Sequence, residues 1–202
     1  MEKERKNKKT ILIILLIAVI ALAIGFAAFT TQLKIKSSAT VSPDPSNFKV
    51  VFSSSATSEA TGNIIRGGRA EGGTFEKNAT TLSGLTANFT APGQTATWKF
   101  YAFNGGQYDA FLNKAILGSI VCIPDGADPA KVAEASKGIS IKISAGGQEY
   151  TSSDENINSH SLAKGVGEEV IVTLTYAAGS TAVDGNFDVT IGDIILEYNS
   201  AD

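Results

Sequence analysis

Few residues in this chain could carry out chemistry. The sequence holds one histidine, His160, between two serines in a polar stretch, and one cysteine, Cys122, in an apolar run. A zinc hydrolase needs several nitrogen, sulfur or carboxylate ligands, and a serine or cysteine triad needs a histidine base beside its nucleophile. The sequence therefore predicts no enzyme and no cofactor. We expect Cys122 to be a small buried hydrophobe; the alternative is a reactive thiol or an intermolecular bridge.

Three oxygen-bearing side chains recur at every second position near the C-terminus, namely Asp184, Asn186 and Asp188. Alternating oxygen ligands occur in calcium loops, but the EF-hand pattern also needs a bidentate glutamate that is missing here. The simpler interpretation is a hairpin turn at Asp184-Gly185, followed by the solvent face of a strand. A calcium site formed by these three residues remains the alternative hypothesis.

The composition is typical of an all-β protein with an acidic body. The chain has 20 glycines and only 18 % charged residues, and short Val/Ile/Thr/Phe runs alternate with Gly, Ser and Asn clusters. The whole chain has a net charge of −3, although its first ten residues are basic, with five Lys or Arg against two Glu. The rest of the chain is therefore acidic. Because nucleic acids need a basic surface, we expect no nucleic-acid partner.

An apolar run of nineteen residues follows the basic N-terminus. As a helix it would be about 28 Å long, close to the hydrocarbon thickness of a bilayer. By the positive-inside rule, we expect the basic N-terminus to stay in the cytoplasm and the rest of the chain to be exported. A cleaved signal peptide and a retained anchor both fit. We therefore predict a cytoplasmic tail and signal or anchor helix over residues 1–30 and an extracellular domain over 31–202, at the cell surface or released. The predicted membrane segment runs over residues 11–29 and includes Ile11, Leu16, Ile20 and Phe29.

A strictly alternating segment comes next, from Gln32 to Val41. Its period of two predicts a strand with one buried face, and Pro43 ends it. Two interpretations stay open: the strand pairs within its own domain, or it pairs with the exposed sheet edge of a neighbouring molecule. The face that would be buried carries Leu33, Ile35, Ala39 and Val41, with Ser37 between them.

We expect the fold to be centred on residues 92–121. Residues 95–103 place Trp98, Phe100 and Ala102 on one face, which predicts a strand inside a sheet. Glycines at Asn104-Gly105-Gly106 predict a hairpin to a second strand.

Other signals complete the predicted domain. Asp128 and Pro129 predict a short helix that ends at Lys137. The alternation slips at Gly192-Asp193, which predicts a β-bulge, and Thr57–Gly73 is expected to be a long loop or mobile hairpin. With about eight or nine strands, the domain is predicted to be a jelly-roll or Ig-like β-sandwich with one short helix.

Several short motifs follow one another along the chain: Ala27-Ala28-Phe29, Leu82-Ser83-Gly84-Leu85, Pro92-Gly93-Gln94, Asn104-Gly105-Gly106 and Asp109-Ala110-Phe111-Leu112. In this order they resemble the TasA and camelysin group of Gram-positive surface and biofilm-matrix proteins. The resemblance covers residues 20–122 and implies a jelly-roll sandwich, export and, in some members, fibres built by donating an N-terminal strand. The stretch that matches the donor is 32–41, although this domain is shorter than those of the fibre formers.

Two functions follow as expectations. The first is a membrane-anchored or fibre-forming structural protein of the cell envelope or matrix, which associates with its own copies through strand 32–41. The second is a monomeric binding module, such as an adhesin or a calcium- or glycan-binding domain, whose site would lie in loops Thr57–Gly73 and Ser152–Ser161. Neither loop contains an aromatic residue, which disfavours glycan binding.

Overall fold

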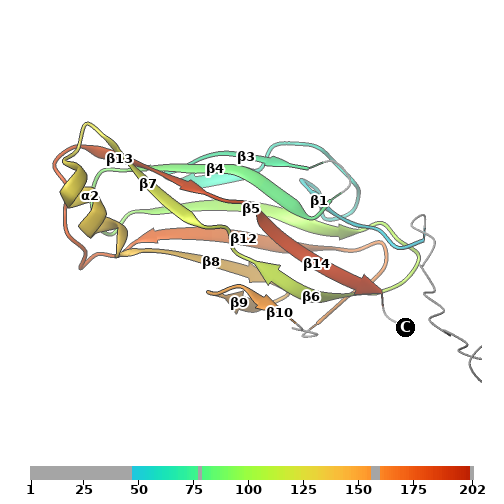
Figure 1. Cartoon of the computed structure of the whole chain (residues 1–202). Coiled ribbons are helices and arrows are strands. Elements are labelled where there is room, and N and C mark those ends of the chain that lie inside the picture. Colours follow the sequence, from blue (N-terminus) through green and yellow to red (C-terminus); the bar gives the residue numbers. More distant parts are fainter. Residues whose placement is uncertain (1–46, 77–78, 156–159, 201–202) are drawn as a thin grey trace, which may run out of the picture. The chain divides into compact units, whose positions relative to one another are not determined.

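The computed structural model describes residues 47–76, 79–155 and 160–200, which form two antiparallel β-sheets around one apolar core, with one short helix (Figure 1). The predicted all-β, sandwich-like class is confirmed. The predicted membrane segment 11–29, the domain boundary at residue 30 and the strand 32–41 lie outside the described residues. No helix in the described ranges is long and apolar enough to cross a membrane.

The first sheet is centred on β5 and β12. β12 pairs along one edge of β5 from Thr95 to Phe103, so β1 and β2 share the other edge. β8 and β9 then continue the sheet beyond β12. Its strands are β1 (Val50–Ser53), β2 (Ile65–Gly68), β5 (Thr95–Asn104), β8 (Ile139–Ala145), β9 (Gln148–Tyr150) and β12 (Gly167–Tyr176).

The second sheet is centred on β4, which pairs with β3 on one edge and with β13 and β14 on the other. β7 pairs with β13 and β6 with β14, while β10 and β11 pair with the far edge of β6. Its strands are β3 (Ala70–Phe75), β4 (Thr81–Phe89), β6 (Ala110–Ile116), β7 (Ile120–Asp125), β10 (Asp154–Glu155), β11 (Ser161–Leu162), β13 (Asn186–Ile191) and β14 (Ile194–Ser200).

Strand β5 lies inside its sheet with Trp98, Phe100 and Ala102 buried, as predicted. The predicted hairpin over 92–121 is wrong, because β6 belongs to the other sheet. The reason is the fully buried Asn104, whose Nδ2 donates to the carbonyls of Tyr108 and Leu162 at 2.9 Å. Its Oδ1 accepts from the N–H of Gly106 at 3.0 Å. These bonds direct the chain across the sandwich.

The stretch Thr57–Gly73 is not one long loop, since β2 and most of β3 lie within it. The chain passes from the first sheet to the second at Arg69, whose N–H donates to the Thr95 carbonyl at 2.9 Å. Glycine makes this close approach possible. Gly68 has a φ of +64°, and a Cβ there would lie 2.1 Å from the Thr95 oxygen. Glycine-rich sequence here therefore builds a sheet corner.

The β-bulge predicted at Gly192-Asp193 is wrong, because the pairing with β4 keeps its register across these residues, and the register shift of β14 lies between Glu197 and Tyr198. The slip in alternation is instead an interruption between β13 and β14, and Ile191 and Ile194 on its two sides are both buried. The neighbouring strands β6 and β7 are interrupted at the same level. There the Gly192 N–H donates to the Ser119 carbonyl at 2.8 Å. A Cβ on Gly118 would lie 2.1 Å from the Gly192 oxygen. The two breaks therefore form one shared kink across the sheet.

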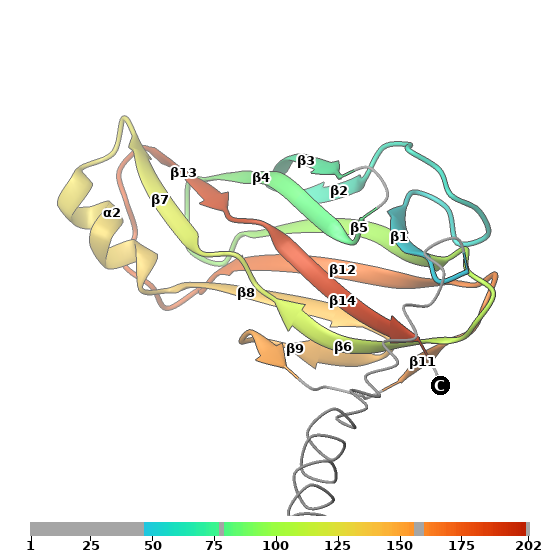
Figure 2. The same cartoon turned by 45° about the vertical axis from the view of Figure 1, so that its right-hand side comes forward.

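The predicted helix is α2 (Pro129–Ser136), one residue shorter than expected. Asp128 caps it by accepting the N–H of Ala130 at 2.8 Å. Val132 and Ala135 are its buried residues. Figure 2 shows α2 at one end of the sandwich, between β7 of the second sheet and β8 of the first. The helix therefore covers the gap between the sheets at that end.

Candidate functional site

The free edge of β7 is the feature of the described domain best suited to an interaction. β7 pairs with β13 on one side, where Val121 lies opposite Thr190 and Ile123 opposite Asp188. On its other side no strand of the described ranges pairs with it. The corresponding side of the preceding strand, β6, is occupied by β10 and β11. Among the strands that the structure describes, a position for one more strand is therefore open beside β7.

Strand β7 has the composition of an interior strand. Val121 and Ile123 point outward and are 51 % and 49 % exposed, while Ile120 and Cys122 point the other way, toward α2. A strand that is apolar on both faces is normally buried on both. Edge strands are normally protected by charges, proline or bulges, and here Pro124 and Asp125 protect only the end of β7. The stretch from Ile120 to Ile123 is left open.

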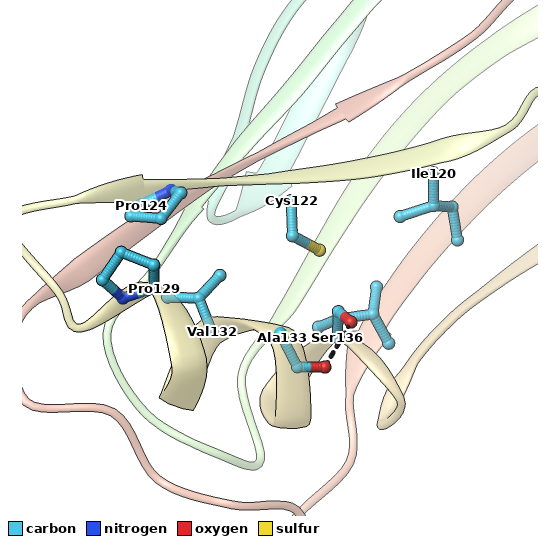
Figure 3. A pocket seen from close by; sticks show the side chains of 8 residues that line it. Ile120, Cys122, Pro124, Pro129, Val132, Ala133 and Ser136 are labelled. Atoms are coloured by element: carbon cyan, nitrogen blue, oxygen red, sulfur yellow. Dashed lines mark hydrogen bonds between the residues drawn. The ribbon is translucent and has the colours of Figure 1, made fainter.

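A groove of about 410 Å³ lies between β7 and α2, and we name it the β7–α2 groove. In Figure 3 the Cys122 sulfur points from β7 toward the helix. No charged side chain lines the groove, and the hydroxyl of Ser136 is already used, since it donates to the Ala133 carbonyl at 2.8 Å. The groove is lined by Ile120, Cys122, Pro124, Pro129, Val132, Ala133, Ser136 and Ile139.

Small-molecule sites usually combine an apolar cavity with a few converging polar groups. The β7–α2 groove offers apolar walls, one thiol and one occupied hydroxyl. It therefore lacks the converging polar side chains that would hold a small polar ligand in one orientation.

Cys122 is half-buried in the wall of this groove rather than fully buried as expected. Burial raises the pKa of its thiol. Because the thiolate is the reactive form, the raised pKa keeps this thiol a weak nucleophile at neutral pH. Cys122 is therefore a packing residue of the groove that still reaches solvent.

The outer side of the β7 edge is acidic. Asp125 shares the outer face of β7 with Val121 and Ile123, and Asp188 lies beside Ile123 on β13. Both carboxylates are exposed; the amide of Asn88 donates to Asp188 at 2.7 Å. The edge thus presents apolar side chains toward the groove, and apolar side chains next to negative charge on the opposite face.

The calcium candidates lie close to this edge. Asp184 pairs with the Lys131 ammonium at 2.7 Å and is 94 % exposed. The hydrogen bond from Lys131, and then its charge, lower the pKa of Asp184. Asn186 and Asp188 lie on the outer face of β13. Among the described residues, no three His, Cys, Asp or Glu side chains are grouped to hold a metal ion. The calcium site stays a prediction.

A cluster around Glu168 was not predicted from the sequence. His160, expected in an exposed polar loop, has a side chain that is only 16 % exposed, with Nε2 2.6 Å from Glu168 Oε2. The hydroxyl of Tyr198 donates to Glu168 Oε1. A Cβ on Gly146 would lie 2.2 Å from His160 Nε2, so the imidazole packs directly on that backbone. The cluster connects β12, β14 and the chain before β11.

Comparison of the chain with protein-family models, with curated proteins and with solved structures finds no match. The resemblance to the TasA and camelysin group therefore stays a prediction from its short motifs. Neither of the two expected functions gains or loses support from these comparisons.

Proposed function

We propose that this chain is an exported structural protein of the cell surface, membrane-anchored or fibre-forming, which associates with its own copies by adding a β-strand to an open sheet edge. The observation that carries the proposal is the edge strand β7, which is apolar on both faces and exposes about half of Val121 and of Ile123. An open apolar edge of this kind is a template for another strand. We further propose a jelly-roll or Ig-like sandwich, supported by the crossings between sheets at Arg69 and after Asn104.

The energetic gain at this edge is modest for one contact. Fully burying a Val or Ile side chain contributes about 1.5–3 kcal/mol, so burying the exposed halves of Val121 and Ile123 contributes roughly 1 kcal/mol each. Backbone hydrogen bonds along the new ladder add to this. Such a contact suits a protein whose copies are concentrated on one membrane or along one fibre, because a high local concentration offsets the cost of association.

The sequence supplies the other two parts of the proposal. The apolar run over residues 11–29 after a basic tail supports export, and the alternating stretch 32–41 supplies a strand with one apolar face. Both lie outside the described residues. The predicted partners are thus the membrane, other copies of this chain and components of the envelope or matrix.

The test is to express the full chain in a Gram-positive host and to recover it separately from membrane, wall and medium. The N-terminal residue and the assembly size are then determined for each fraction. We expect assemblies larger than a monomer, and we expect deletion of residues 32–41 to abolish them while the domain keeps its melting temperature. Assemblies that persist without residues 32–41, or a monomer in every fraction, would contradict the proposal.

A further inference from the structure

We infer that a pocket between β2 and β3 binds one acidic sugar residue, whose carboxylate is held by Arg66. This inference goes beyond the proposed function and does not depend on strand addition. The pocket has a volume of about 320 Å³. In the described ranges β2 and β3 are edge strands of the two sheets, and they lie beside each other (Figure 2). The lining includes Thr61, Asn63, Ile64, Arg66, Thr74 and Phe75.

Arg66 gives the pocket its positive charge, and the backbone holds its side chain in place. Its Nε donates to the carbonyl of Gly72 at 2.6 Å, from β2 across to β3. This bond fixes the plane of the guanidinium. No carboxylate of the described residues forms an ion pair with Arg66, so both terminal nitrogens keep their donors for a ligand. A guanidinium in this state suits a carboxylate, which it binds through two parallel hydrogen bonds.

The charges around the pocket narrow the class of ligand. Among the described residues that line it, Arg66 is the only charged one. One cation suits a carboxylate better than a phosphate group, which carries about −1.5 to −2 charges at neutral pH. A zwitterionic amino acid fits poorly, because no lining carboxylate would pair with its ammonium group. The nearby Glu71 lies opposite Thr86 on β4 and does not line the pocket.

The walls suit a ring that is apolar on its face and hydroxylated at its edge. Ile64 is only 5 % exposed, and the ring of Phe75 packs against that of Phe100 with centroids 5.6 Å apart, so both walls are firmly supported. A pyranose ring carries CH groups on its faces and hydroxyl groups at its edge, which match an aromatic wall and a polar rim. The rim is formed by the exposed residues Thr61, Asn63 and Thr74.

The pocket changes the expectation for the stretch Thr57–Gly73. That stretch contains no aromatic residue, which disfavours glycan binding when it is considered alone. The structure adds Phe75, which lies on β3 just beyond the stretch and completes the wall of the pocket. The missing aromatic side chain is therefore supplied by the next residues of the chain.

The pocket also reaches Trp98, the only tryptophan in the sequence. Gly73 lines the pocket with a φ of +90°, and a Cβ there would lie 3.4 Å from Trp98 Cδ1. Trp98 is fully buried, and its Nε1 donates to the carbonyl of Glu71 at 2.9 Å. A ligand in the pocket lies close to this indole, so the fluorescence of Trp98 reports when the pocket is occupied.

The inference is tested by titrating the full-length chain in detergent with glucuronate, glucose, acetate and benzoate, followed by calorimetry and by Trp98 fluorescence. Glucose has the ring without the carboxylate, and acetate has the carboxylate without the ring. We expect each to bind at least about tenfold more weakly than glucuronate. Tighter binding of benzoate than of glucuronate would show that the pocket takes an apolar acid. That result, or no binding of glucuronate at about 10 mM, would overturn the inference.

Two arginines provide a matched pair of variants. Arg66→Gln should weaken glucuronate binding at least about tenfold, and Arg66→Lys several-fold, because lysine lacks the planar fork. The control is Arg69→Gln, since Arg69 is exposed, bonds to Thr90 and does not line the pocket. We expect it to bind glucuronate like the wild type, with equal melting temperatures throughout. Equal losses from Arg66→Gln and Arg69→Gln would mean general attraction between charges and would overturn the inference.

A uronic-acid polymer distinguishes the two sources of such a ligand. If alginate binds as tightly per residue as free uronic acids, the ligand is part of an acidic polysaccharide; if only the free acids bind, it is a soluble sugar acid. Both results support the inference. Its outcome is also separate from that of the proposed function: glucuronate binding by a chain that forms no assemblies would contradict strand addition and leave this site standing.

Discussion

The Tyr198 hydroxyl donates a hydrogen bond to Glu168 inside the sandwich, and only 9 % of the tyrosine is exposed. The other oxygen of the same carboxylate lies 2.6 Å from His160 Nε2. These three residues come from distant parts of the sequence, and they fix β12 to β14 near the end of the domain where β5 finishes. Because Tyr198 is an ionisable group held out of water, the relationship makes the stability of the fold dependent on pH.

Burial, and then the charge of Glu168, hold the pKa of Tyr198 well above its usual value. The folded state therefore keeps this proton at a pH where the unfolded state loses it. The resulting stabilisation is complete below the ordinary tyrosine pKa of about 10 and is lost as pH rises above it. We expect the free energy of unfolding in urea to fall between pH 9 and 11, and to fall less in Tyr198→Phe.

At pH 7, Tyr198→Phe should lower the free energy of unfolding by about 1–3 kcal/mol, because Glu168 loses a donor in a buried position. Tyr108→Phe is the control, since Tyr108 is 49 % exposed. An equally steep alkaline fall in wild type and Tyr198→Phe would mean that other groups control it.

Strand β7 should tolerate charge without unfolding. Replacing Val121 and Ile123 together by lysine places charges on exposed positions of the edge, so stability should change by less than about 1 kcal/mol. Assembly should fall at least about tenfold, because charged edges resist strand pairing. Sedimentation of the full chain measures the assemblies. Ile65→Lys, 61 % exposed on another strand, should leave them unchanged; an equal effect of Ile65→Lys would point to general surface charge.

Two glycines with similar backbone angles should differ sharply in their tolerance of alanine. Gly68 and Gly84 have φ values of +64° and +69°. A Cβ on Gly68 would lie 2.1 Å from the Thr95 oxygen, whereas one on Gly84 meets nothing within 4 Å. We expect Gly84→Ala to cost about 1–2 kcal/mol from the left-handed conformation alone, and Gly68→Ala to cost clearly more. Equal losses in chemical denaturation would show that the corner opens easily.

Asn104 should be one of the most sensitive polar positions. Its side chain is fully buried and bonds to two backbone groups in the loop after β5 and to one at the end of β11. Asn104→Ala leaves these groups without a partner, and each costs about 1–3 kcal/mol when it stays buried. We expect a loss of at least about 2 kcal/mol in urea unfolding, against almost none for the exposed Asn63→Ala. A loss below about 0.5 kcal/mol would mean that water replaces the side chain.

Local patterns predicted which side chains are buried, but not which strands are neighbours. Alternation identified the buried face of β5, and Asp128 with Pro129 identified the start of α2, because both signals depend on residues close in sequence. The partner of β5 depends instead on the bonds of Asn104 to Tyr108 and Leu162, and Leu162 lies 58 residues away. A period of two is compatible with any partner strand, so the predicted hairpin was wrong.

The candidate site was beyond prediction for the same reason. The sequence shows that Ile120-Val121-Cys122-Ile123 is an apolar run, but an apolar run does not reveal that its strand lies at an edge. The groove likewise depends on where α2 lies relative to β7. The glycines of β2 and β3 were interpreted as a loop, because a positive φ is needed equally in a turn and at a sheet corner.

The placement of β1 has a mechanical consequence. β1 is the first described strand, and Val50 to Ser53 pair antiparallel with Asn104 to Tyr101 at the end of β5. Tension applied to the chain before Asn47 along the strand axis would load these pairs in shear, all at once, and not peel them apart one by one. The rest of β5 is held by nine pairs with β12. A domain tethered through its N-terminal side is thus attached at a point where pulling force spreads into the centre of the first sheet.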